Sequence, residues 1–218
     1  RGGHAFSYPV QVTRTVEQAL QSIAGKYSMV YWYDGSDKGD PWKVYAVNLG
    51  AWARPWVNDL NELRFGESYW ISLTQVITLQ LNGGAASALT VYGKPEGTVR
   101  TSGFDGNIQS PPATFYGLVL GGFNFTPAPG TTVTAWINGK PCGQGKTLQV
   151  NGEIVYTLNV FADGPGGGAG CGGPGQVVTF KIEDRSMSPV VTWDNNELRE
   201  VPLSGVHRVY LPVILKNR

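Results

Sequence analysis

The sequence predicts a mainly β protein made of two small β-domains, the second a sandwich, with one short helix in the first. Three observations predict this fold class. The 218 residues include 30 Gly and 14 Pro, a content typical of turn-rich β proteins. Apolar and polar side chains alternate in many short segments, as strands with one buried face require. The second half holds seven such segments, spaced as in a sandwich.

The first 26 residues predict a strand followed by the short helix. Residues 5–13 alternate cleanly and predict the opening strand. Thr15 and Gln18 have the spacing of a capping box, and an apolar stripe at helical spacing follows. Gly25 is placed to end the helix.

Four further segments complete the first domain, residues 1–83. Aromatic and β-branched residues predict strands at 27–34, 42–47, 69–73 and 76–81. We expect a helical turn or loop at residues 57–65.

Three runs of this domain, VYWYDGSDKGDPWKVY, VNDLNEL and GESYWISL, resemble a small module of secreted and cell-surface bacterial proteins. The resemblance covers residues 10–81, and the module closes with a GxGYWI-like ending, which reads GESYWI here. It implies an extracellular setting and no catalytic role.

Residues 84–112 are rich in small residues and predict a linker, in which 89–92 can pair as a short strand. The second domain, residues 113–204, carries the seven strand candidates. Asn138-Gly139 and Asn151-Gly152 predict tight hairpin turns. The predicted strands are residues 114–120, 131–137, 147–150, 153–161, 176–183, 189–193 and 197–203.

The runs FYGLVLGG, PGTTVTAWINGKPCGQG, IVYTLNV, GQVVTFKI and VTWDNNELREVPLS resemble an immunoglobulin-like or transthyretin-like sandwich. Such domains occur in bacterial surface proteins and as appendages of secreted hydrolases. The resemblance implies that the last strand of the sandwich ends at Leu203.

The C-terminal extension, residues 205–218, reads GVHRVYLPVILKNR and is apolar on both faces of a predicted strand. It can pair at the edge of its own sandwich, or serve as a sorting tail, since YLPVILKN resembles the ends of secreted proteins of some thermophilic bacteria. It can also pair with a neighbouring copy of the chain, which we take as the functional hypothesis. The residues predicted to carry assembly are Val209, Tyr210, Leu211, Val213, Ile214 and Leu215.

Charge and cysteine content limit the partners and the cellular compartment to be expected. A net charge of +1 indicates no nucleic-acid surface, and no apolar run reaches the length of a membrane span. Because the chain begins at Arg1, we expect a processed, soluble, secreted protein. Cys142 and Cys171 belong to no CxxC or metal-type pattern, so they predict a disulfide formed in an oxidising compartment.

Catalysis is not predicted. The two histidines, His4 and His207, lie near opposite termini, and no GxSxG elbow accompanies them. We therefore expect a protein that is not an enzyme and has no cofactor other than a possible calcium ion.

Two ligand hypotheses remain open. Asp34, Asp37 and Asp40 are spaced by three on one loop and can hold calcium, or they can simply form a hydrophilic turn. Trp52 and Trp56 are candidates for stacking on a sugar ring of a polysaccharide, against the alternative of core packing.

The function predicted from these features is a non-enzymatic extracellular structural protein. It would be a subunit of a surface filament or layer, a homopolymer joined by terminal strands. The alternative is a carbohydrate-binding or accessory module of a secreted enzyme.

Overall fold

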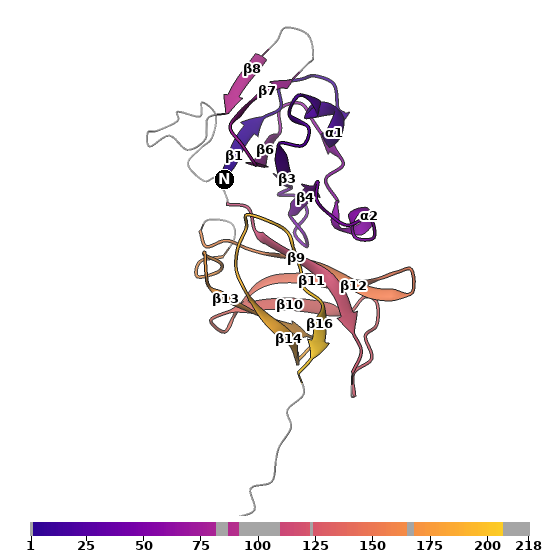
Figure 1. The fold of residues 1–218 in the computed structure, drawn as a ribbon. Coiled ribbons are helices and arrows are strands. Elements are labelled where there is room, and N and C mark those ends of the chain that lie inside the picture. The colour runs from indigo at the N-terminus through magenta and orange to yellow at the C-terminus, as the bar shows by residue number, and fades with distance from the viewer. Residues whose placement is uncertain (1, 82–86, 92–109, 123, 165–167, 207–218) are drawn as a thin grey trace, which may run out of the picture.

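The computed structural model describes residues 2–81, 87–91, 110–122, 124–164 and 168–206 (Figure 1). These residues are mainly β-strand with short helices. They form an N-terminal sheet with its covering segments and a C-terminal barrel, stacked one above the other in Figure 1. The predicted fold class is confirmed. No helix within these ranges is long and apolar enough to cross a bilayer.

The N-terminal sheet is antiparallel, with strand order β1–β6–β3–β4. One face packs on a core that includes Phe6, Tyr8 and Leu20, and the other on a core that includes Tyr31 and Trp42. Because both faces of this sheet are buried, its aromatic strand segments have no polar face. The strands are β1 (Gly2–Ser7), β3 (Tyr27–Tyr33), β4 (Trp42–Ala46) and β6 (Ser68–Leu73).

The predicted capping box is present at α1 (Val16–Ala19), where Gln18 N donates to Thr15 Oγ1 at 3.3 Å. A 3₁₀ turn, η1 (Gln21–Ile23), follows, so the helical stripe continues without a longer helix. Strands β2 (Arg14–Thr15) and β5 (Glu62–Leu63) pair beside it. A second short helix, α2 (Arg54–Val57), adds to the single helix predicted; Pro55 in its first turn favours helix initiation.

Strand β7 (Ile77–Leu81) forms an antiparallel pair with β8 (Ser87–Val91). The short strand expected inside residues 84–112 is therefore present, two residues earlier than its predicted start.

In the C-terminal barrel the described strands close a ring in the order β9–β12–β11–β10–β13–β14–β16 and back to β9. The Asn-Gly turns join β10 to β11 and β11 to β12, with positive φ at all four of their residues. The strands are β9 (Ala113–Leu120), β10 (Thr132–Ile137), β11 (Lys140–Val150), β12 (Glu153–Val160), β13 (Val177–Ile182), β14 (Arg185–Thr192), β15 (Arg199–Glu200) and β16 (Leu203–Gly205).

The segment predicted as one strand at residues 197–203 is split into β15 and β16, which both run parallel to β9. Pro202 lies between them and has no N–H to donate, so it interrupts the ladder. The ring closes at β16, which pairs with β9 on one side and β14 on the other.

Candidate functional site

The six residues predicted to carry assembly, Val209, Tyr210, Leu211, Val213, Ile214 and Leu215, lie outside the described residues. The structure does describe the strand from which the extension continues. Ser204 of β16 pairs with Leu120, the last residue of β9. Gly205 pairs with Met187 of β14, which begins only two residues earlier, at Arg185. Val206 N donates to Ser186 O at 3.3 Å. The end of β9 and the start of β14 therefore both lie within two residues of the last described pairing of β16.

Trp52 and Trp56 lie together on the loop around α2, and Trp56 Nε1 donates to the Trp52 carbonyl at 2.8 Å. Their ring centroids are 5.3 Å apart. Tyr116 of β9 joins them, at 6.3 Å from Trp52 and 6.0 Å from Trp56. Trp52 is 40% exposed, whereas Tyr116 is buried. Trp56 is half-buried, so Trp52 is the most exposed ring of this aromatic cluster.

A cleft of about 690 Å³ lies between the N-terminal sheet and the C-terminal barrel, and Tyr116 lines it. Residues of β3, β4 and β6 line it, together with Tyr116 of β9 and the loop between β14 and β15. No Lys, Arg or His is among its lining residues, so the cleft is uncharged or acidic. The polar side chains that line it are Ser28, Asn48, Ser72, Thr74, Asp194, Asn196 and Glu197.

Two of the three predicted calcium ligands converge, but on a lysine, and the third bonds within its own turn. Asp34 Oδ1 accepts a bond from Ser36 Oγ at 2.6 Å. Asp37 and Asp40 instead bind the ammonium of Lys43, at 2.9 and 3.4 Å. Within the described part of the chain no group of three or more His, Cys, Asp or Glu is arranged to hold a metal. Calcium at this loop stays a prediction, which would require Lys43 to move away.

Asp59 is the third carboxylate around Lys43, at 3.6 Å. Burial raises the pKa of Asp59 to about 6, although its Oδ1 accepts a bond from Val44 N at 2.7 Å. Partial burial of Lys43 opposes its charged form, but the bond to Asp37 and the three nearby carboxylates raise its pKa overall. The Lys43 ammonium is therefore the cation that these carboxylates contact.

A chain of polar side chains crosses from the sheet to the barrel, and sequence reasoning missed it. Tyr31 Oη lies 2.8 Å from Thr114 Oγ1, and Thr114 donates to Asn159 Oδ1 at 2.7 Å. Asn159 Nδ2 in turn donates to Asp40 Oδ1 at 2.9 Å and to Trp42 O at 3.0 Å. A lone Asn in a strand pattern carries no signal of such a role.

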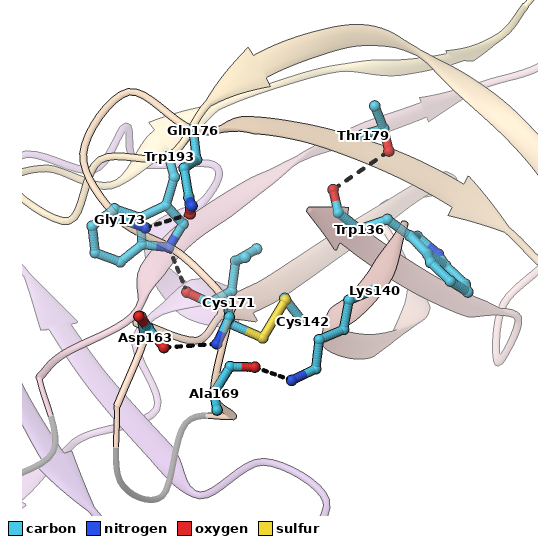
Figure 2. The surroundings of a disulfide bond; sticks show 12 residues. Trp136, Lys140, Cys142, Asp163, Ala169, Cys171, Gly173, Gln176, Thr179 and Trp193 are labelled. Atoms are coloured by element: carbon cyan, nitrogen blue, oxygen red, sulfur yellow. Dashed lines mark hydrogen bonds between the residues drawn. A yellow bond between two sulfur atoms is a disulfide. The ribbon is translucent and has the colours of Figure 1, made fainter. Parts of the chain in front are cut away.

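The predicted disulfide is present between Cys142 of β11 and Cys171 of the glycine-rich loop after β12 (Figure 2). Lys140 Nζ donates to Ala169 O beside it, and Gly170 N donates to Asp163 Oδ1 at 2.7 Å. Trp193 Nε1 donates to Val160 O at 2.9 Å across the same loop. The disulfide therefore fixes a loop against the barrel and leaves no free thiol among the described cysteines.

Comparison of the chain with protein-family models, with curated proteins and with solved structures finds no match.

Proposed function

We propose that the chain is a non-enzymatic extracellular structural protein, a subunit of a surface filament or layer assembled by strand donation. Residues 207–218 of one copy would pair with a strand of the next copy. The observation that supports this most directly is that the barrel ring closes at β16, before those residues begin.

The pairing register supports the same proposal. Gly205 pairs with Met187, so only Ser186 and Arg185 of β14 remain beyond it, and β9 has already ended at Leu120, which pairs with Ser204. Neither β9 nor β14 extends past this point, so a ladder for residues 208–218 would need another strand. An apolar strand without a partner at home is a ready donor.

The apolar side chains make such a joint strong. Val209, Leu211, Val213 and Leu215 share one face of a strand. At about 1.5–3 kcal/mol for each fully buried side chain, they contribute about 6–12 kcal/mol before ordering costs. A donor and an acceptor at different places on the subunit form a heterologous contact, which propagates into a fibre instead of closing.

Deletion of residues 207–218 tests the proposal. The truncated chain should keep the melting temperature of the folded subunit and remain monomeric, while the full chain polymerises, as seen by electron microscopy and light scattering. Deletion of residues 216–218 alone is the matched control, because it spares the apolar residues. Polymers of the truncated chain would refute strand donation.

A second candidate, a carbohydrate-binding accessory module, is favoured by the exposed Trp52, whose ring packs against Tyr116 in the wall of a cleft lined by amides, hydroxyls and carboxylates. Such a mixture of one aromatic surface and several polar groups suits a neutral sugar. If this function holds, Trp52→Ala should abolish retention on polysaccharide in a pull-down. Phe65→Ala, at an exposed aromatic outside the cleft, should leave retention unchanged.

A further inference from the structure

Strand donation needs an acceptor, and the described residues show which sheet edges are open. The outer edge of β4 is occupied: Val44 N and Ala46 N donate to Asp59 Oδ1 and Asn58 Oδ1, at 2.7 and 2.9 Å. The edge of β7 is bound by Ser22, whose Oγ accepts from Gln80 N at 3.0 Å. Among the described residues, none covers in this way the edge of β1 that faces away from β6.

The direction of the β1 peptide groups follows from Tyr8. Tyr8 N donates to Glu67 O, and Gly66 N donates to Tyr8 O, both at 2.9 Å, so Tyr8 faces β6. Peptide groups alternate along a strand, so Phe6 and His4 also face β6. Gly3, Ala5 and Ser7 therefore point their N–H and C=O groups outward. No described residue is hydrogen-bonded to these outward groups.

We propose that this outward edge of β1 is the acceptor for residues 209–215 of a second copy. The assignment rests on the proposed function and names the surface that it needs. At about 3.3 Å per residue the six residues of β1 span about 20 Å and the seven apolar residues about 23 Å. The two lengths match.

Pro212 determines where the added strand lies in the sheet and which of its peptide groups face β1. Proline has no N–H, so a strand that contains it is excluded from the middle of a sheet and belongs at an edge. Added outside β1, the segment becomes the new edge, with the nitrogen of Pro212 facing solvent. Val209, Leu211, Val213 and Leu215 then have the opposite parity, and their peptide groups face β1.

The side chains on the two strands are complementary. In an antiparallel pairing, the apolar residues at 209, 211, 213 and 215 form hydrogen-bonded pairs with Gly3, Ala5 and Ser7. Their side chains then lie on the same face of the sheet as those small residues. Trp70 of β6 lies on that face, because a Cβ on Gly3 would contact its ring at 3.6 Å. The Val and Leu side chains would cover this half-buried indole. Figure 1 shows β16 at the end of the barrel away from β1, so the strand that precedes the donor segment and the acceptor edge lie at opposite ends of the subunit.

The test uses Ala5→Pro in the full chain. The variant loses an N–H that the sheet does not use, so its circular dichroism and melting temperature should be close to wild type. Its self-association should be at least about tenfold weaker. Ala5→Ser keeps the N–H and should assemble as wild type. Ala5→Lys, an edge lysine that leaves the backbone unchanged, replaces the proline variant if that variant does not fold.

A mixing experiment separates acceptor from donor. Ala5→Pro keeps its donor segment, and the chain truncated after Val206 keeps its acceptor edge. Neither should polymerise alone, but together they should form a two-chain complex that grows no further, measured by light scattering on a sizing column. Assembly of Ala5→Pro at wild-type strength, or a mixture that stays monomeric, overturns the β1 assignment. Polymers of the truncated chain alone overturn strand donation itself.

Discussion

Lys43 and its three carboxylates show how single residues set the electrostatics of the first domain. The loop DGSDKGDP offers three acids to any cation, yet the cation that Asp37, Asp40 and Asp59 contact is the Lys43 ammonium. Asp34, the remaining acid of the predicted set, bonds within its own turn. The spacing of acids was visible in the sequence, but the position of Lys43 between them was not.

Asp59 predicts a pH dependence. Its pKa is about 6 in the folded chain against an ordinary value of 3.8, so the folded state binds the proton more tightly than the unfolded state. Its contribution to stability is fully present below about pH 4 and is lost as the pH rises to about 6. Asp59→Asn should keep the bond to Val44 N, so the stability of the variant relative to wild type should rise between pH 4 and 6.

The measurement is urea denaturation at several pH values. Asp34→Asn is a control of opposite sign. Bonds from the Ser36 side chain and backbone lower the pKa of Asp34, so the stability of wild type relative to Asp34→Asn should fall on acidification. Parallel stability curves for wild type and Asp59→Asn would contradict the assignment.

At the scale of elements, the loop between β12 and β13 is held by the disulfide and by Trp193 (Figure 2). A Cβ on Gly172 would lie 2.0 Å from Trp193 Nε1, whereas one on Gly173 would meet nothing nearer than 3.8 Å. The indole and the loop backbone are thus in direct contact, which leaves no room for a Cβ at Gly172 but does leave room for one at Gly173.

Gly172→Ala should therefore destabilise the barrel by about 1–3 kcal/mol, because the indole or the loop must shift. Gly173→Ala, the matched control, should change the free energy of unfolding by less than about 0.5 kcal/mol. Chemical denaturation of the oxidised proteins measures both. Equal effects of the two substitutions would show that the loop adjusts freely.

The whole molecule depends on the junction between the sheet and the barrel. Tyr116 packs into the same core as Met29 and Trp42, and Asn159 bonds both Asp40 and Trp42 across the junction. Loss of the amide would leave polar partners without their bonds, at a cost of the order of 1–3 kcal/mol.

Asn159→Ala should lower the unfolding free energy of the full chain by that amount and weaken the coupling between its two parts. Differential scanning calorimetry should then show a broader transition or two separate ones. Thr157→Ala, at another half-buried position on the same strand, is the control and should leave the transition single. An Asn159→Ala scan like that of the control would place the coupling in the apolar core instead.

Periodicity and turn chemistry in the sequence determined most of the strands, the capping box, the Asn-Gly hairpins and the disulfide, because each depends on neighbouring residues or on there being only two cysteines. Only the tertiary structure decided that β9 and β16 close the ring, that Tyr116 joins Trp52 and Trp56, and that Lys43 fills the acidic loop. Asn159 meets Asp40 from 119 residues away. Contacts of this kind depend on how sheets pack, which leaves no local pattern, whereas a strand records its buried face in every second residue.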